Sequence, residues 1–289
     1  MMREKTLDTL LKEGKAYLKG HNISQSALDA ELLFMQVLDI TRIELFTKSK
    51  MKISETKQKE YIRLLEQRAQ GIPLQYLKGT QEFMGLSFLV TPAVLIPRPD
   101  TEILVESVLE YGENQEFQNI AEVGTGSGCI SISLAYYHPK LKIVAGDISI
   151  ETLKVAIKNS VRHQVQNQIQ WIQSDIFGSF PNSMKGKFDA IISNPPYIPT
   201  EDIPTLMKEV KDHEPYHALN GGKDGLDFYR RIIQEGNEFL KSGGYFFFEI
   251  GKGQEVQVGN LLKNENYEMV EVRKDLSGIN RVVIGSKRK

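Results

Sequence analysis

The tetrapeptide NPPY at residues 194–197 places a carboxamide, two rigid rings and an aromatic side chain directly after the apolar run AIIS. Two prolines cannot continue a sheet ladder, so the strand predicted over 188–193 must end here. The side-chain oxygen of Asn194 and the carbonyl of Pro195 can each accept one hydrogen bond from a planar NH2 group. The ring of Tyr197 can pack against the plane of that group and shield a nearby positive charge. A plain rigid turn is the alternative interpretation.

A glycine loop precedes this tetrapeptide in the stretch NIAEVGTGSGCISISLAYY, which reads as a short apolar strand, a loop and a helix. Its glycines allow a tight turn and a close approach of the backbone to a ligand. Cys129 stands where a dinucleotide-binding fingerprint requires its third glycine, and no Gly-Lys-Ser/Thr follows for a phosphate-binding P-loop. The pattern E-x-G-x-G-x-G resembles S-adenosylmethionine (SAM)-binding loops instead. The predicted cofactor contacts in the loop are Gly124, Thr125, Gly126, Ser127 and Gly128.

Two aspartates end the next predicted strands. Asp147 follows the apolar run KIVAG about 20 residues after the loop, where a carboxylate can accept both ribose hydroxyls of a nucleotide. Asp175 ends the following strand, and we expect it to receive the adenine amino group, with Ile176 against the adenine ring. Because ligands in open α/β sheets bind at the carboxyl ends of strands, these residues and Asn194 are expected to contact the cofactor in one crevice. A helix N-cap or a turn is the alternative role of each aspartate.

The chemistry that fits these residues is methyl transfer to a planar nitrogen. A carboxamide NH2 is a poor nucleophile because its lone pair is delocalised, so a site must hold both N–H bonds and aim the nitrogen at the sulfonium methyl. Near-attack positioning of this kind can supply roughly 7–11 kcal/mol. No general base is obvious and none is strictly needed, because the nitrogen becomes strongly acidic once methylated. The residues predicted to perform the transfer are Asn194, Pro195, Pro196 and Tyr197.

The composition is that of an ordinary globular protein, with 289 residues, 40% of them hydrophobic and 25% charged. The formal net charge of −1 gives no whole-molecule attraction to nucleic acid or to an anionic membrane. A single cysteine excludes an internal disulfide and a multi-thiolate metal site. No apolar run approaches the roughly 20 residues that span a bilayer, and the N-terminus lacks the apolar core of a signal peptide. We therefore expect a cytoplasmic protein with no membrane contact and no direct nucleic-acid contact.

Hydrophobic periodicity divides the chain into three parts. Residues 1–72 read as helices only, with a capping box over Ser26–Asp29 and another helix start at Ser54. Residues 73–95 read as a β-hairpin linker. Helical and strand patterns alternate over 96–289, which predicts an α/β domain with a mostly parallel sheet covered on both faces. The strands are expected at 119–123, 141–146, 169–173, 188–193, 244–250, 267–272 and 280–285.

The segments that flank these motifs carry a specific resemblance. PLQYLKGTQEFMGLSFLVTPAVLIPRPDTE, NPPYIP, EPYHALNGGKDGLDFYRRI, FEIGKGQ and DLSGINRVV resemble the bacterial protein-(glutamine-N5) methyltransferases that modify class I peptide chain release factors. The match covers nearly the whole chain and is weakest over the first 70 residues. Glu122 stands where the family commonly has aspartate, and Ile176 stands where some members carry a large aromatic residue.

The resemblance implies a class I SAM-dependent methyltransferase with a Rossmann-like sheet and a small N-terminal helical domain. It implies that the methyl acceptor is the glutamine of the release factors' Gly-Gly-Gln loop, held by residues 194–197. It further implies that SAM contacts Gly124–Gly128, Asp147 and Ile176. The helical bundle over 1–72 is expected to dock the release factor, and a bundle that is scaffold only is the alternative.

Two other functional hypotheses stay open at this point. A DNA or RNA base amino-methyltransferase could use the same NPPY chemistry, although no separate basic recognition domain is apparent. A non-catalytic binding module is the other. Arg98 either lines the mouth of the site or pairs with a surface carboxylate, and the segment LIPRPDTE is expected to enter a helix capped by Asp100 or Thr101.

Two further features lie between the NPPY tetrapeptide and the next predicted strand. His213 and His217 are four residues apart, but they lack a convincing third ligand, so no metal is expected. The glycine-rich stretch NGGKDG at 220–225 reads as a mobile loop near the site, either a lid or a plain turn.

Overall fold

The computed structural model describes residues 5–288 and divides into two compact units. Residues 1–4 and 289, which end the first and last predicted parts of the chain, lie outside the described residues. The helical unit holds the described residues up to Gly79 and the segment Met207–His213, and the sheet unit holds Thr80–Leu206 and the described residues from Glu214 onward.

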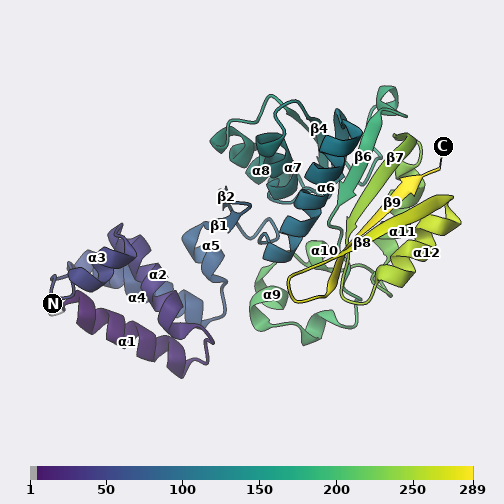
Figure 1. Ribbon diagram of the computed structural model, residues 1–289. Helices are drawn as coiled ribbons and strands as arrows, with labels where there is room; N and C mark the ends of the chain where they lie inside the picture. Colours follow the sequence, from purple (N-terminus) through teal and green to yellow (C-terminus); the bar gives the residue numbers. More distant parts are fainter. Residues whose placement is uncertain (1–4, 289) are drawn as a thin grey trace. The chain divides into compact units, whose positions relative to one another are not determined.

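The helical unit is built from amphipathic helices whose leucines share one buried core (Figure 1). Leu7, Leu10 and Leu18 of its first helix are at most 2% exposed, as their spacing along one helical face predicts. Gly14 lets this helix approach a neighbour closely, because a Cβ there would lie 2.2 Å from the hydroxyl oxygen of Tyr61. The helices are α1 (Leu7–Gly20), α2 (Ser26–Leu38), α3 (Arg42–Thr47), α4 (Glu55–Ala69), α5 (Leu74–Lys78) and α9 (Lys208–His213).

The helix starts show where local signals decide and where tertiary contacts override them. Ser54 caps α4 as predicted, because its side chain accepts a hydrogen bond from the backbone N–H of Lys57. The capping box predicted over Ser26–Asp29 is wrong. Helix α2 begins after Gln25, and the Asp29 carboxylate binds Arg68 instead of closing a cap.

A buried ion-pair cluster joins distant parts of the helical unit. Arg68 donates from Nε to Oδ2 of Asp29 at 2.7 Å and from Nη2 to Oε1 of Glu209 at 2.6 Å. Arg68 and Asp29 are each only 4% exposed. Removing one partner of such a pair leaves the other charge buried and uncompensated. The cluster therefore fastens α9, a segment remote in sequence, to the core of the helical unit.

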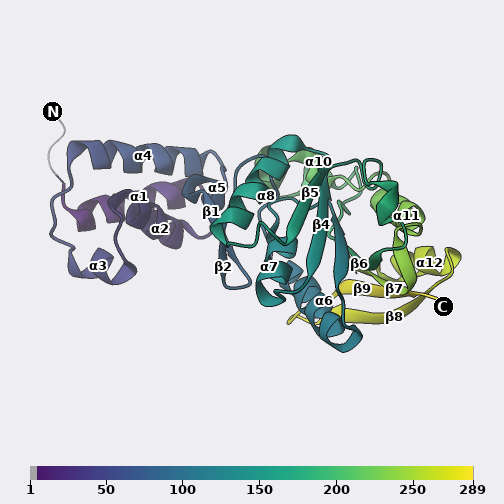
Figure 2. The ribbon, with the colours of Figure 1, turned by 90° about the horizontal axis from the view of Figure 1, so that it is seen from above.

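The sheet unit contains a seven-stranded sheet of order β5-β4-β3-β6-β7-β9-β8 (Figure 2). The first five strands in this order run parallel, and β9 is antiparallel to both of its neighbours. The chain moves outward from β3 to β4 and β5 and then returns to β6 on the other side of β3. The strands are β3 (Asn119–Val123), β4 (Lys142–Asp147), β5 (Ile169–Gln173), β6 (Phe188–Ser193), β7 (Leu240–Glu249), β8 (Tyr267–Lys274) and β9 (Asn280–Lys287).

Helices cover both faces of this sheet, which confirms the predicted architecture. Successive residues of a strand face opposite sides. Ile120 and Phe247 belong to one core cluster with residues of α6 and α7, whereas Ala121 and Phe246 belong to another with residues of α11 and α12. The helices of the unit are α6 (Glu102–Gln115), α7 (Cys129–Tyr137), α8 (Ile150–Arg162), α10 (Tyr216–Leu219), α11 (Asp227–Gly236) and α12 (Glu255–Asn264).

A separate antiparallel hairpin, β1 (Thr80–Phe83) and β2 (Leu86–Leu89), opens the sheet unit. The hairpin predicted over 73–95 is too long on its N-terminal side, because α5 occupies that stretch and ends at Gly79 with a φ of +74°. Phe83 and Phe88 are at most 1% exposed and join the core of the sheet unit, so the hairpin is part of that unit. Within residues 5–288, no helix is long and apolar enough to cross a membrane.

Candidate active site

The carboxyl ends of β3 and β6 lie side by side where the strand order reverses, the place where open α/β sheets bind ligands. The hydroxyl of Ser193 at the end of β6 donates to the carbonyl of Val123 at the end of β3 at 2.7 Å. A cavity of about 290 Å³ opens at this edge. Most predicted site residues line it, and Gly128 and Tyr197 are the two that do not. Those that do are Gly124, Thr125, Gly126, Ser127, Asp147, Asp175, Ile176, Asn194, Pro195 and Pro196.

The glycine loop needs its glycines for two different reasons. Gly124, Gly126 and Gly128 have φ values of +75°, +57° and +81°, a region that other residues rarely enter. A Cβ on Gly124 or Gly126 would meet nothing within 4 Å, so the loop leaves room for a ligand. Gly128 serves packing as well, because a Cβ there would lie 2.9 Å from Ile132 of α7 and 3.1 Å from Ala156 of α8.

Glu122, the acidic residue before the loop, ties the loop to the start of α7. It is fully buried, and its Oε2 accepts hydrogen bonds from the hydroxyl of Thr125 at 2.8 Å and from the N–H of Ser131 at 3.1 Å. Burial raises the pKa of Glu122 to about 7, although these hydrogen bonds act to lower it. Its Oε1 has no hydrogen-bond partner within the described part of the chain. One acceptor of this carboxyl therefore remains unused by the protein.

Asp147 ends β4 with a carboxylate that holds the glycine loop. Its Oδ2 accepts from the N–H of Gly126 at 3.0 Å, and its Oδ1 accepts from the N–H of Ser149 at 3.0 Å. Ser149 is the cap of α8, so Asp147 forms the turn before the helix and not the cap itself. Burial raises the pKa of Asp147. Each carboxylate oxygen keeps a further lone pair, so the ribose contact stays a prediction that this geometry permits.

Asp175 forms a bidentate ion pair with Arg231 of α11, with N–O distances of 3.1 and 3.0 Å. Both side chains line the cavity, and Arg231 was not identified from the sequence. The adenine contact of Asp175 stays a prediction. Ile176 is buried with a φ of +51°, which is an outlier for a β-branched residue. Strained residues of this kind persist where the surrounding structure holds them, often at functional sites.

The NPPY turn presents its first three residues to the cavity. Nδ2 of Asn194 donates to the hydroxyl oxygen of Thr101 at 3.2 Å, so Oδ1 is the amide atom left to face the cavity. Tyr197 instead packs its partly buried ring against the core cluster that α11 and α12 share with the sheet, and burial raises the pKa of its hydroxyl. The predicted packing of this ring on an acceptor amide stays a prediction.

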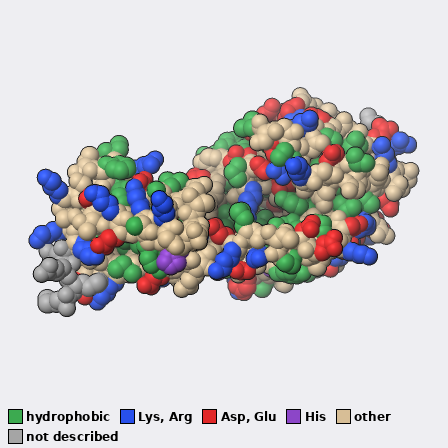
Figure 3. All heavy atoms as spheres, turned by 90° about the horizontal axis from the view of Figure 1, so that it is seen from below, with side chains coloured by type: hydrophobic (Ala, Val, Ile, Leu, Met, Phe, Trp, Pro, Cys, Tyr) green, Lys and Arg blue, Asp and Glu red, His purple; other side chains and the backbone are tan. Residues whose placement is uncertain are grey.

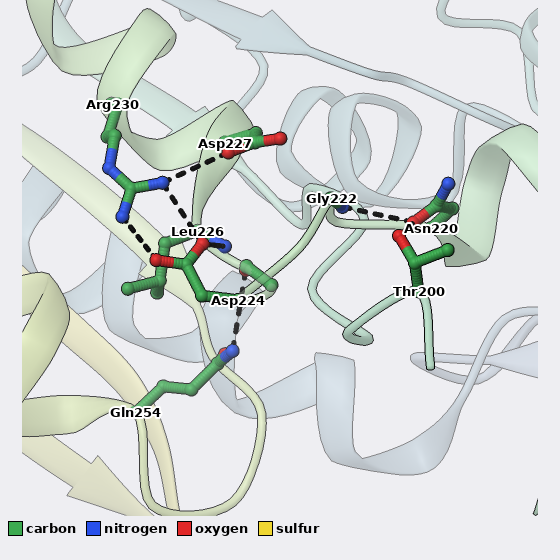
Figure 4. Close-up of polar contacts among 9 residues, drawn as sticks. Thr200, Asn220, Gly222, Asp224, Leu226, Asp227, Arg230 and Gln254 are labelled. Atoms are coloured by element: carbon green, nitrogen blue, oxygen red, sulfur yellow. Dashed lines mark hydrogen bonds and ion pairs between the residues drawn. The ribbon is translucent and has the colours of Figure 1, made fainter. Parts of the chain in front are cut away.

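The loop NGGKDG and Gln254 fasten the NPPY turn from behind (Figure 4). The N–H of Gly221 donates to the carbonyl of Ile198 at 2.8 Å. Nε2 of Gln254 donates to the carbonyls of Tyr197 at 3.0 Å and of Gly225 at 3.4 Å. A Cβ on Gly225 would lie 2.3 Å from the carbonyl oxygen of Tyr197, so the close approach of the two segments requires glycine here.

The same loop is tied within itself. Arg230 of α11 pairs with both oxygens of Asp224, and the side-chain oxygen of Asn220 accepts from the hydroxyl of Thr200 at 2.8 Å (Figure 4). These contacts correct the prediction of a mobile loop over 220–225 in favour of an ordered turn that supports the NPPY backbone.

The mouth of the cavity carries Arg98 and His217. Arg98 donates to Oε1 of Glu214, which is only 5% exposed, so its partner is a buried carboxylate and not a surface one. Among the residues that the structure describes, no group of three His, Cys, Asp or Glu side chains is placed to hold a metal ion.

Thr101, Glu249 and Gln254 were not identified as site residues from the sequence. Thr101 occupies the N-cap position of α6, but its side chain makes no cap hydrogen bond and accepts one from Asn194 instead. Glu249 is the last residue of β7, and Gln254 follows shortly after it. The strand-end rule that found Asp147 would have found Glu249 if it had been applied to this strand.

Comparisons with known proteins cover both units. Residues 9–79 match the PrmC N-terminal domain, and residues 99–210 match the methyltransferase small domain. A release factor glutamine methyltransferase of Clostridium botulinum is 41% identical over 277 residues, which is 96% of this chain and 98% of the relative. One of Clostridium acetobutylicum is 40% identical over 97% of this chain and 98% of that protein. The chain belongs to the release factor glutamine methyltransferase family.

Solved structures of methyltransferases share the fold at much lower identity. The catalytic domain of hMettl16 in complex with MAT2A 3′UTR hairpin 6 matches with a TM-score of 0.57 at 16% identity, over 78% of this chain and 82% of that domain. The T. thermophilus 16S rRNA N2 G1207 methyltransferase in complex with AdoMet and guanosine matches with a TM-score of 0.52 at 17% identity, over 72% and 50%. At these identities the likeness shows the fold alone.

SAM is the methyl donor of this SAM-dependent family, and the residues of the cavity fit it. The loop glycines leave open space, Asp147 offers spare acceptor lone pairs, and the hydroxyl of Ser127 is buried at the cavity with no hydrogen-bond partner within residues 5–288. An unsatisfied buried hydroxyl is costly unless a ligand or water completes it. The individual cofactor contacts stay predictions.

Proposed function

We propose that this protein transfers the methyl group of SAM to the side-chain N5 of the glutamine in the Gly-Gly-Gln motif of class I peptide chain release factors, and so tunes translation termination. The observation that carries the proposal is the nearly full-length similarity to release factor glutamine methyltransferases, at 41% identity in one case. The shape and chemistry of the cavity support the same reaction.

The acceptor amide is to be held by two oxygens of one rigid turn. SAM supplies an electrophilic methyl on a sulfonium. Oδ1 of Asn194 and the carbonyl of Pro195 each accept one N–H of the glutamine amide, which fixes the nitrogen in the cavity. Such positioning can supply roughly 7–11 kcal/mol of the barrier. The methylated nitrogen then releases a proton to water or through these two acceptors.

We further propose that the helical unit helps to dock the protein substrate. Residues 9–79 match the N-terminal domain that family members carry beside their methyltransferase domain. The target glutamine belongs to a loop on a large folded partner, so contacts outside the cavity must orient that partner. The reaction is placed in the cytoplasm, where release factors act.

A base amino-methyltransferase is not favoured by these observations. Nucleic-acid binding surfaces concentrate Lys and Arg on one face. On the face of the sheet unit seen in Figure 3, Lys and Arg side chains are interspersed with Asp and Glu. The full-length relatives reported above also carry the release factor name.

Transfer of labelled methyl from SAM tests the proposed function. Unmethylated class I release factor, duplex DNA and a structured RNA serve as acceptors in parallel reactions with the full chain. We expect label in the release factor only, and no label with Asn194→Ala. Label in DNA or RNA with none in the release factor would overturn the proposal.

A further inference from the structure

A fully buried carboxyl lies beside the acceptor site and has no part in the reaction as proposed. Glu249 is 2% exposed, and its Oε2 accepts no hydrogen bond from any described residue. Burial raises the pKa of Glu249 to about 7, while hydrogen bonding from Thr101, the charge of Arg281 and hydrogen bonding from Asn194 act to lower it. Burying a carboxyl is costly unless it is paired, so its presence here requires a reason.

The sheet register brings Glu249 next to Asn194. Ser193 of β6 pairs with Phe248 of β7 in parallel register, so the next residues of the two strands, Asn194 and Glu249, leave the same sheet edge side by side. Thr101, which is 2% exposed, reaches this place from the turn before α6 and accepts a hydrogen bond from Nδ2 of Asn194. The inner side of the Asn194 amide therefore faces a hydroxyl and a carboxyl.

Arg281 does not neutralise Glu249 through an ion pair. Its guanidinium donates from Nε to Asp275 at 2.9 Å and lies 2.7 Å, through Nη2, from the carboxylate of Asp100. Within residues 5–288, no ion pair includes Glu249. The acceptor capacity of the carboxyl is therefore available to the neutral donors around it.

An asparagine amide can present either of its ends at nearly the same shape, and its partners select which one. With Nδ2 inward, the amide donates to Thr101 and faces the Glu249 carboxyl with a donor, while Oδ1 is directed to the cavity. With Oδ1 inward, acceptors would meet acceptors, and Nδ2 would confront the N–H of the incoming amide. We propose that Glu249, together with Thr101, is a positioning residue that fixes the amide of Asn194 with Oδ1 toward the acceptor nitrogen. This inference rests on the proposed function.

Kinetics of three variants in the full chain test the proposal. Glu249→Gln replaces a pure acceptor by a group that can also donate, so it no longer selects one orientation of Asn194. We expect kcat for methyl transfer to fall by roughly 10- to 100-fold, as the loss of a hydrogen bond to a charged group allows. The Kd for SAM should change by less than about threefold. Thr101→Val should lower kcat in the same way, and Thr101→Ser, which keeps the hydroxyl, should recover most of that loss.

Tyr229→Phe is the matched control. It removes the hydroxyl that donates to the backbone carbonyl of Glu249 at 2.8 Å and leaves the carboxyl in place. We expect its kcat to stay close to the wild-type value. Equal losses of kcat and thermal stability in Glu249→Gln and Tyr229→Phe would assign Glu249 a structural role and overturn the proposal.

The side-chain NH2 of Asn194 gives a readout that needs no methyl acceptor. Its NMR signals can be assigned by their loss in Asn194→Asp. We expect slow exchange of these protons with water in the wild type, and exchange at least about tenfold faster in Glu249→Gln but not in Tyr229→Phe. Unchanged exchange in Glu249→Gln would overturn the inference. A wild-type protein that shows the slow exchange but transfers no methyl to a release factor would refute the proposed function alone.

Discussion

Replacing Gly221 by alanine should slow methyl transfer without disturbing cofactor binding. The N–H of Gly221 donates to the carbonyl of Ile198, directly after the NPPY turn. An added Cβ would lie 2.7 Å from the carbonyl oxygen of Pro196 and 2.8 Å from Cα of Tyr197. Because both neighbours are backbone atoms, no side-chain rotation can relieve the contact.

The required displacement sets the size of the effect. Ordinary contact of a Cβ begins at 3.4 Å, so the Pro196 carbonyl must retreat from 2.7 to about 3.4 Å, a shift of about 0.7 Å. A misplacement of about 1 Å can cost roughly 100-fold in rate, so we expect kcat to fall by roughly 10- to 100-fold. The overpacking should also lower the free energy of unfolding by about 1–3 kcal/mol. The Kd for SAM should stay near its wild-type value, because the added methyl does not contact the glycine loop over 124–128.

Initial rates of label transfer from SAM to unmethylated release factor measure kcat, and calorimetry measures the SAM affinity. Gly20→Ala is the matched control, because a Cβ on this last residue of α1 would meet nothing within 4 Å. A wild-type kcat in Gly221→Ala would refute the reasoning that the NGGKDG loop positions the NPPY turn.

Asn194→Ala should abolish methyl transfer while changing SAM affinity much less, because it removes one of two acceptors for the amide N–H bonds; near-wild-type turnover would remove Asn194 from the reaction. Arg68→Leu should lower the free energy of unfolding in urea titrations by about 3–5 kcal/mol, because it leaves Asp29 buried without its partner; stability unchanged from the wild type would contradict this account. Burial raises the pKa of Glu249 to about 7 from 4.5, so between these pH values the folded state keeps a proton that the unfolded chain has lost. Stability should therefore fall as pH rises through this window, by up to about 3 kcal/mol from this group. Urea titrations near pH 5 and pH 8 should show that part of the fall disappear in Glu249→Gln, and an equal fall in both proteins would contradict the raised pKa.

The sheet could be predicted because buried parallel strands are short apolar runs bounded by polar residues, glycine or proline. The ranges expected at 119–123, 169–173 and 188–193 coincide with β3, β5 and β6. Strand β7 begins earlier than expected, at Leu240, because Gly243 and Gly244 resemble a turn. Helices α3 and α5 were not predicted, since five or six residues give little more than one turn of periodicity.

The site could be predicted where each residue follows its own strand, as Asp147 and Asn194 do. Thr101 and Glu249 could not be joined to Asn194 in this way. Thr101 is 93 residues from Asn194 in sequence, and the place of Glu249 depends on the register of β6 against β7. The capping box at Asp29 failed for the same reason, because a partner 39 residues away took its carboxylate.

The central claim is that this protein methylates the glutamine of the Gly-Gly-Gln motif in class I release factors. Mass spectrometry of purified, unmethylated release factor, after incubation with the full chain and SAM, tests it most directly. The account predicts a gain of one methyl group that fragmentation maps to that glutamine. A methyl group on another residue, or no gain in mass while the protein binds SAM, would contradict it.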